Sequence, residues 1–385
     1  MAISLRRKRA APRGTYAPNL WPVWIVAPVA LVVAGALGWV IYHYAYDYFA
    51  QAAAEQKPPK PVDINDVLKA AVTALTLIGA VLAGLYAYRK QLLAEGDAHR
   101  ADASQLAERY TTAAEQLGHD QAAVRLAGVY ALARLADDWA EQRQVCIDVL
   151  CAYLRMPYEP DPHGAEHKAG EREVRQTIIR VIRDHLQQPD GPTAWCEHNF
   201  DFTNVVFDGC SFSTSHFRGT VTFSRATFSY GTVDFGRATF SGDVDFGRAR
   251  FDSDVDFGRA TFNGDVDFSR TTFNEGGMVD FGGTSFSGIV DFGRATFNGG
   301  MVDFGRAAFS GGMVDFGRAT FNGGTVDFGS AIFSGRMVTF GRATFNGGDI
   351  DFVGARFSGG VVIFDDATFS GTSFNWGPLH TPTGA

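Results

Sequence analysis

The sequence predicts a mixed fold, in which two membrane-spanning helices and a small helical domain precede a long repetitive β-structure. Two uncharged apolar runs predict the spans, and the amphipathic segments after them predict the helical domain. Of the 33 Phe residues in this chain of 385, 32 lie at or beyond Phe200, where they recur at short intervals. The chain therefore consists of two regions of different composition that meet near residue 197.

The net charge of −8 belongs entirely to the repetitive part. From residue 197 onward the chain has 13 Arg, no Lys and 21 Asp and Glu, which gives 13 − 21 = −8. Residues 1–196 hold 34 − 13 = 21 positive and 42 − 21 = 21 negative charges and are neutral. The four Cys residues are irregularly spaced: Cys146, Cys151, Cys196 and Cys210. Such spacing is not a disulfide framework, so we expect free thiols in a reducing compartment.

Two apolar runs are long enough to cross a membrane. No charged residue occurs in 21–42, and 70–88 form a second uncharged run. At 1.5 Å per residue the first run spans about 30 Å of hydrocarbon. Trp and Tyr residues flank the first run, and Tyr86 and Tyr88 end the second. We predict transmembrane helices at 21–45 and 67–88, joined by an external Pro-rich loop at 46–66.

Basic residues at the ends of the two spans predict their orientation. They are Arg6, Arg7, Lys8, Arg9 and Arg13 in the basic N-terminus, 1–20, and Arg89 and Lys90 after the second span. The positive-inside rule then places both termini in the cytoplasm. A cleaved signal peptide is the alternative, but its apolar core typically has about 7 to 15 residues. Small residues spaced by four, such as Ala34 with Gly38, are suited to close helix packing, although chance also produces them.

The segment 89–196 has the pattern of a small α-helical domain that connects the membrane to the repeats. Apolar residues recur at helical spacing between Val124 and Leu135 and again within residues 171–188, and Gly118 is a natural helix end. The paired short helices resemble HEAT or armadillo units weakly.

Four residues in and after the loop of this connector could ligate zinc: His163, His167, Cys196 and His198. His163 and His167 would approach each other only on a helix. Pro162 and Gly164 argue against a helix there, so a solvated loop and a structural cap are the preferred interpretation.

The repetitive part is organised by Phe residues separated by five residues alternating with six or seven. The predicted core ladder comprises Phe235, Phe240, Phe246, Phe251, Phe257, Phe262, Phe268, Phe273, Phe292, Phe297, Phe304, Phe309, Phe316, Phe321, Phe328, Phe333, Phe340 and Phe345. A spacing of five fits neither a helix nor a simple strand, but it fits a chain that turns a corner every five residues. In the unit VDFGRATFNGG, Val290, Phe292, Ala295 and Phe297 should point inward, whereas Asp291 and Thr296 should point outward.

The units V-D-F-G-R and A-T-F-S-G resemble the pentapeptide repeats of a mainly bacterial family, over about residues 200–374. The resemblance implies a right-handed quadrilateral parallel β-helix at 197–375, followed by a flexible tail at 376–385. Extra residues after alternate units predict about eight coils, each two to four residues longer than four plain pentapeptides. The resemblance also implies a bacterial protein, which the two predicted spans make a multi-pass protein of the plasma membrane.

The recurring Asp residues of the repeats raise the alternative of a calcium-binding β-roll. That motif has a period of nine residues and a different Gly pattern, whereas this chain repeats every 11 to 12. Many of these Asp residues, such as Asp291, are followed three residues later by an Arg, such as Arg294. We therefore expect a solvated ladder of alternating charge rather than a metal site.

No catalytic motif is present, and His is absent from 218–379, so we expect a non-enzymatic protein without a cofactor. The preferred function is a protein-interaction scaffold on the cytoplasmic face of the membrane, whose protein partner the sequence does not identify. The family resemblance also implies an alternative, mimicry of DNA to bind DNA gyrase and protect it from quinolones. The 13 Arg residues and a non-helical tail disfavour this alternative. The negative charge disfavours direct nucleic-acid binding, and a homo-oligomer is a further possibility.

Overall fold

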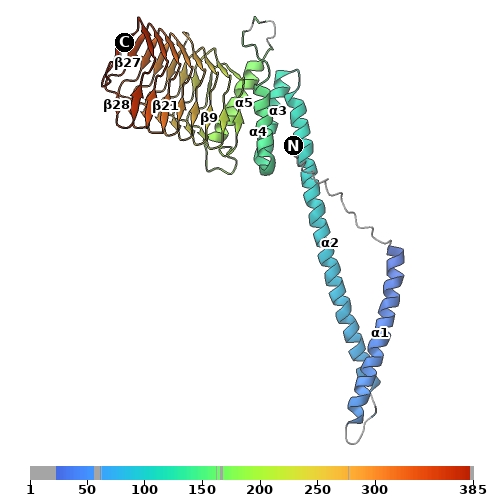
Figure 1. Ribbon diagram of the computed structural model, residues 1–385. Coiled ribbons are helices and arrows are strands. Elements are labelled where there is room, and N and C mark those ends of the chain that lie inside the picture. The colour runs from blue at the N-terminus through green and yellow to red at the C-terminus, as the bar shows by residue number, and fades with distance from the viewer. Residues whose placement is uncertain are drawn as a thin grey trace, which may run out of the picture. The chain divides into compact units, whose positions relative to one another are not determined.

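The structure is a computed structural model that describes residues 23–55, 61, 63–161, 163–164, 168–275 and 277–381. The chain divides into two compact units, Met1–Asp102 and Ala103–Ala385. Helix α1 (Val23–Ala54) lies in the first unit, and helix α2 (Ile64–Leu117) begins there and ends in the second (Figure 1).

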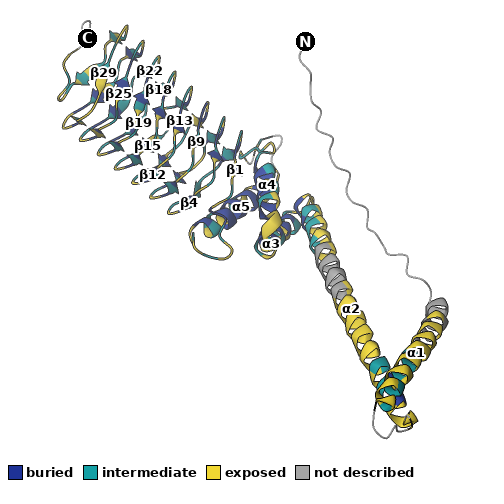
Figure 2. Cartoon of the chain, turned by 60° about the horizontal axis from the view of Figure 1, so that its bottom comes forward, coloured by how far each residue is buried: buried dark blue, intermediate teal, exposed yellow. Residues whose placement is uncertain are grey.

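The first unit contains one candidate membrane span among the residues that the structure describes. This stretch, Ile64–Gln91, is helical, with a mean hydropathy of 2.0, and it includes the second predicted span. The first two residues of the first predicted span, 21–45, lie outside the described residues. Arg6, Arg7, Lys8, Arg9 and Arg13 lie outside them as well. Arg89 and Lys90 lie exposed on α2, and most of both helices is exposed (Figure 2).

The two helices of this unit are longer than the predicted spans. Helix α1 continues to Ala54, because Ala52, Ala53 and Ala54 are strong helix formers. Helix α2 continues past residue 88 to Leu117 and ends before Gly118. A Cβ added at Gly38 would lie only 3.2 Å from Cδ1 of Leu75, so the small residue allows α1 and α2 to approach each other here.

The connector consists of the end of α2 and four short helical elements. They are α3 (Ala122–Asp138), the 3-10 helix η1 (Ala140–Gln142), α4 (Arg143–Leu154) and α5 (Glu171–Leu186). One face of α5 buries Val174, Ile178 and Ile182 against the other helices. These side chains continue directly into the core of the β-structure.

The repetitive part folds into a parallel β-solenoid of the right-handed type, with four sheets. Sheet A contains β1 (Phe200–Asp201), β5 (Val221–Thr222), β9 (Val244–Asp245), β13 (Val266–Asp267), β17 (Val290–Asp291), β21 (Met313–Asp315), β25 (Met337–Thr339) and β29 (Val361–Ile363). Sheet B contains β2 (Val206–Phe207), β6 (Thr227–Phe228), β10 (Arg250–Phe251), β14 (Thr272–Phe273), β18 (Thr296–Asn298), β22 (Thr320–Asn322), β26 (Thr344–Asn346) and β30 (Thr368–Ser370).

Sheets C and D form the other two sides of the solenoid. Sheet C contains β3 (Cys210–Ser211), β7 (Val233–Asp234), β11 (Val255–Asp256), β15 (Met278–Asp280), β19 (Met301–Asp303), β23 (Thr325–Asp327), β27 (Asp349–Asp351) and β31 (Ser373–Asn375). Sheet D contains β4 (His216–Phe217), β8 (Thr239–Phe240), β12 (Thr261–Phe262), β16 (Ser285–Phe286), β20 (Ala308–Phe309), β24 (Ile332–Phe333) and β28 (Arg356–Phe357).

The sheets of eight, eight, eight and seven strands make seven complete coils and three sides of an eighth. The length of each coil follows from the register of sheet A. Val221 pairs with Val244, Val244 with Val266 and Val266 with Val290, so the length varies slightly from one coil to the next. The first coil is the shortest of these, because Phe200 already pairs with Val221. The predicted surplus of two to four residues over four plain pentapeptides therefore holds beyond the first coil.

The core of the solenoid is a set of stacked Phe rings. Every Phe of the predicted ladder from Phe235 to Phe345 is buried. Along the axis the rings lie parallel, as in Phe246 and Phe268, whose centroids are 4.8 Å apart with planes inclined by 4°. Rings on neighbouring columns meet edge to face, as in Phe257 and Phe268 at 84°. Both arrangements suit the charge distribution of an aromatic ring.

Candidate interaction surfaces

The corner that follows each V-D-F segment is a tight turn with an unusual residue in it. In Phe292–Gly293–Arg294–Ala295 the N–H of Ala295 donates to the carbonyl of Phe292 at 2.9 Å, and Arg294 has a φ of 63°. A four-residue turn with a positive φ at its third residue is a type II turn, which usually has Gly or Asn there. This chain places Arg at that position again and again.

At the corner between sheets A and B, six successive coils have Arg in this left-handed position. We call them the arginine row: Arg225, Arg248, Arg270, Arg294, Arg318 and Arg342. All six are exposed. Sheet A adds four aspartates on the other side of the same corner: Asp245, Asp267, Asp291 and Asp315.

At the corner between sheets C and D the balance of charge is reversed. Six successive coils place an aspartate on sheet C, and we call them the aspartate row: Asp234, Asp256, Asp280, Asp303, Asp327 and Asp351. The left-handed position of this corner is Arg in three coils only: Arg237, Arg259 and Arg306. A groove of about 930 Å³ is lined by the aspartate row, by these three Arg residues and by several Gly residues of the same turns.

The aspartates are fixed by the backbone of their own turn. Asp234 Oδ1 accepts the N–H of Gly236 at 2.7 Å, and Asp291 Oδ1 accepts that of Gly293 at 2.6 Å. The half-buried position raises the pKa of the Asp280, Asp291 and Asp327 carboxyls. The donated N–H opposes this rise in pKa, and the neighbouring aspartates add to it. The expected Asp–Arg charge ladder is thus a set of Asp–Gly turns, with the charges sorted into separate rows.

Sheet B is almost uncharged by comparison. Its outward positions are mostly Thr, and Asn residues of successive coils stack beside them. Asn322 Nδ2 donates to Asn298 Oδ1 at 3.0 Å, and Asn346 Nδ2 donates to Asn322 Oδ1 at 3.2 Å. These bonds stabilise the stacking of the coils without adding charge.

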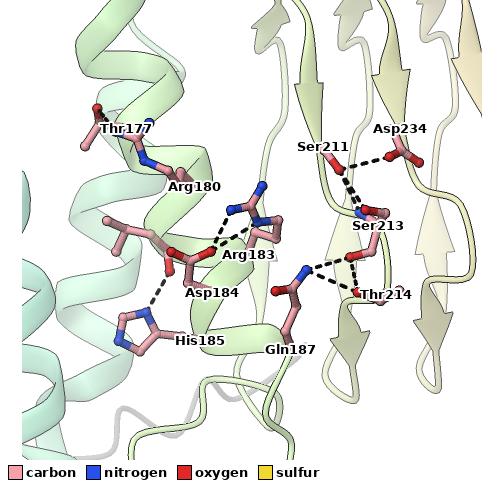
Figure 3. A network of polar contacts seen from close by, with 11 residues as sticks. Thr177, Arg180, Arg183, Asp184, His185, Gln187, Ser211, Ser213, Thr214 and Asp234 are labelled. Carbon is pink, nitrogen blue, oxygen red and sulfur yellow. Dashed lines mark hydrogen bonds and ion pairs between the residues drawn. The ribbon is translucent and has the colours of Figure 1, made fainter.

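The connector covers the first coil of the solenoid. Figure 3 shows Gln187, at the end of α5, beside the first coil, where its Nε2 donates to the carbonyl of Ser213 at 3.0 Å and to Thr214 Oγ1 at 3.1 Å. In the same view Ser211 Oγ donates to Asp234 Oδ2 at 3.0 Å. The aspartate row therefore begins directly beyond the connector.

An aromatic cap lies at the opposite end of the solenoid. Trp376 stacks on Phe374, with ring centroids 4.3 Å apart, and also contacts Phe364 and Phe369. Leu379 packs against the same core. Trp376 and Leu379, which we expected in a flexible tail, therefore cover the last coil.

The connector contains buried charged residues that the sequence did not identify. Arg125 Nη2 lies 3.2 Å from Glu171 Oε2, and both side chains are almost fully buried. The hydroxyl of Tyr153 donates to Glu171 Oε2 at 2.9 Å, and burial together with this hydrogen bond raises the pKa of Tyr153. Arg175 donates to the carbonyl of Leu154 at 2.6 Å. Arg125 occurs at a polar position of its amphipathic helix, and only its tertiary contacts show that its side chain is buried.

The candidate zinc ligands are not brought together among the residues that the structure describes. His163 is exposed in the loop, and His167 lies outside the described residues. Cys196 is buried, with its Sγ directed to the carbonyl of Leu186 at 3.5 Å, and His198 Nδ1 lies 3.1 Å from Gln144 Oε1. Within the described ranges no group of three or more His, Cys, Asp or Glu side chains is placed to hold a metal ion.

The four cysteines are free thiols. Burial raises the pKa of Cys146 to about 11 and that of Cys151 to about 12. Such thiols are protonated at neutral pH and therefore weakly nucleophilic. They act as packing residues in this structure.

Four sheets of very short parallel strands around stacked Phe rings define a β-solenoid repeat protein. The family model of pentapeptide repeats, of nine copies, matches residues 202–250 and 230–272. This match and the solenoid together support a pentapeptide-repeat protein. No curated protein and no solved structure matches the chain.

The division of the charges into rows is the feature of the surface that sequence reasoning missed. The required signal was present: once the sequence is written one coil to a line, one corner has Arg in six successive coils, and the opposite corner has Asp in six successive coils with Arg in only three. Single Asp–Arg pairs conceal this division, because they relate residues within one coil rather than between coils.

Proposed function

We propose that the protein is a non-enzymatic scaffold, anchored in the bacterial plasma membrane, whose solenoid binds a protein partner at the cytoplasmic face. The observation that carries this proposal is the pair of charged corners, which offer long, regular and accessible rows of Arg and Asp side chains. Six-coil rows suit recognition of an extended charged surface better than of a small molecule. The apolar helix Ile64–Gln91 supports the anchor, and the pentapeptide repeats support a role in binding rather than catalysis.

The partner is tested by affinity capture of the full chain from membranes in mild detergent. The wild-type chain should retain a specific protein that a variant with Arg248, Arg270 and Arg294 changed to Glu does not retain. A matched variant with the exposed acidic residues Asp365 and Asp366 changed to Lys should still retain it. Capture of no specific protein by the wild-type chain would contradict the scaffold.

The orientation is tested separately by thiol labelling in intact cells. A Ser330→Cys chain, altered at an exposed corner, should react with an impermeant maleimide only after the cells are opened. Labelling of intact cells would overturn the cytoplasmic assignment. Three of the four native cysteines are buried and Cys210 is partly buried, so the wild-type chain serves as the background control.

The aspartate row favours a second candidate, mimicry of the DNA backbone toward DNA gyrase. Six stacked carboxylates form a linear array of negative charge on one corner of the solenoid. The arginine row on the opposite corner is the argument against it, because mimicry requires an anionic rod. Addition of the full chain in detergent micelles to a gyrase supercoiling assay tests this candidate, and unchanged supercoiling at micromolar protein would remove it.

A further inference from the structure

The two charged corners lie diagonally opposite each other on the solenoid. The chain passes through sheets A, B, C and D in order in every coil, so the A–B and C–D corners are separated by half a turn. The A–B corner has six Arg and four Asp, a balance of 6 − 4 = +2. The C–D corner has three Arg and six Asp, a balance of 3 − 6 = −3. The solenoid thus has one basic and one acidic corner.

The Arg residues of the basic corner have a strained backbone conformation. All six residues of the arginine row have φ between 57° and 63°, where Gly would be free of strain. The corresponding position of the C–D corner is Gly283 in one coil and Gly354 in another. The fold therefore accepts Gly at such a corner, yet the A–B corner has Arg in six coils in succession.

The arginine row is little used within its own chain. Among the described residues its one ion pair is that of Arg342 with Asp366, at 3.5 Å, and both side chains are largely exposed. The carboxylates of the aspartate row accept N–H groups of their own turns, as Asp303 does from Gly305 at 2.5 Å. Exposed guanidinium groups on one corner and carboxylates on the other are thus available to another molecule.

We propose that solenoids of this protein associate side by side and in parallel, the arginine row of one copy lying against the aspartate row of the next. Moving a copy sideways without rotation brings its C–D corner to the A–B corner of the first copy. Because both rows occupy the second to the seventh coil, they then meet coil by coil, with Arg294 facing Asp303. In this arrangement the aspartates of sheet A also face the Arg residues of the C–D corner.

A two-fold dimer is less favourable electrostatically. Two A–B corners brought together would combine to +4 and two C–D corners to −6, whereas one of each combines to −1. A contact between different corners does not close on itself, so each copy keeps one free corner of each kind. The association should therefore extend into rows of copies. The inference does not depend on the membrane anchor or on any other partner.

Cross-linking in the membranes of cells that express the full chain tests the contact directly. Membranes that contain both an Arg294→Cys chain and an Asp303→Cys chain should give a mixed dimer with a short bifunctional maleimide. Either variant alone should give no more dimer than the wild-type chain, whose thiols are mostly buried. Equally strong cross-linking of Arg294→Cys alone would overturn the proposal in favour of a two-fold dimer, and no cross-linking in the mixture would overturn it altogether.

Sedimentation of the full chain in detergent provides a second, quantitative test. The wild-type mass should increase with concentration beyond that of a dimer and decrease with added salt, because the contact is between exposed charges. Reversal of Arg248, Arg270 and Arg294 to Glu should raise the dissociation constant at least about tenfold. The matched reversal of Arg237, Arg259 and Arg306 should have a smaller effect, because these three Arg residues occupy the same kind of turn at the C–D corner but do not belong to the arginine row. A wild-type mass that stays at one copy or stops at two would overturn the proposal, whatever other protein the scaffold binds.

Discussion

The connector and the solenoid both bury large side chains, but the contacts of the solenoid are repeated in every coil, whereas those of the connector occur once. In the solenoid each Phe makes the same contacts as the Phe in the next coil, as the parallel pairs Phe268–Phe292 and Phe292–Phe316 show, both at 4.8 Å. In the connector the Arg125–Glu171 ion pair, with Tyr153 beside it, has no second copy. Stability in the solenoid therefore depends on position along the axis, whereas in the connector it depends on single contacts.

This difference also separates the surfaces of the two regions. Repetition brings identical side chains into rows about 4.8 Å apart, so one change in the repeat unit is multiplied along the solenoid. The connector has no such multiplication: Arg125 pairs with Glu171 within the domain, whereas Arg155 and Arg172 pair with Asp201 and Asp208 of the first coil. Recognition by rows is therefore a property of the solenoid, and the connector covers the open end of its core.

Replacement of a central Phe should have the largest effect on the solenoid. Phe292→Ala removes a fully buried ring with neighbours on both sides, and we expect a loss of about 4 kcal/mol in the free energy of unfolding. Phe369→Ala, in the last coil, should cost about 1 kcal/mol, because that ring is only partly buried. Hydrogen exchange of the strands around each site measures both losses. Equal losses would contradict the dependence on axial position.

The connector should respond to the loss of one charge. Glu171→Gln leaves Arg125 buried without its carboxylate, which should cost about 3 kcal/mol. The matched change Glu173→Gln, on the same helix, affects an exposed pair 3.8 Å apart and should be nearly neutral. Hydrogen exchange of α3, α4 and α5 is the measurement. A neutral Glu171→Gln variant would show that the pair does not hold the connector together.

Much of the solenoid could be predicted from sequence, because its repeat leaves few alternatives. The spacing of Phe and the Val or Ala two residues before it determine which side chains point inward. The division of Arg and Asp into rows required the register between coils, which depends on the number of residues at each corner. The buried position of Arg125 could not be predicted from helical periodicity, because it results from contacts between distant helices. The same limit applies to Trp376, whose packing depends on the open end of the last coil.

Two adjacent glycines at one corner of the solenoid, Gly311 and Gly312, differ in the space available for a side chain. A Cβ at Gly311 would overlap the carbonyl oxygen of Gly288 in the preceding coil, whereas one at Gly312 would meet only Ile289 Cγ1, at 3.9 Å. Gly311→Ala should therefore cost about 2 kcal/mol, and Gly312→Ala should be tolerated. Thermal unfolding of both variants beside the wild-type chain tests this, and equal midpoints would mean that the corner adjusts freely.

The smallest expected effect concerns the charge of the stacked aspartates. The pKa of Asp280, Asp291 and Asp327 is raised above its ordinary value of 3.8, so the folded chain binds these protons more tightly than the unfolded chain. Their contribution to stability is present below pH 3.8 and is lost as the pH rises through the folded pKa values. Changing all three to Asn keeps the acceptor for the Gly N–H and removes the charge. The triple variant should thus unfold at a higher temperature than the wild-type chain at pH 7, and the difference should shrink toward pH 4. The matched control is Asp365→Asn, at an exposed position of the last coil. A triple variant that is less stable than the wild-type chain at pH 7 would contradict the prediction, because it would show that the carboxylate charge stabilises the turns.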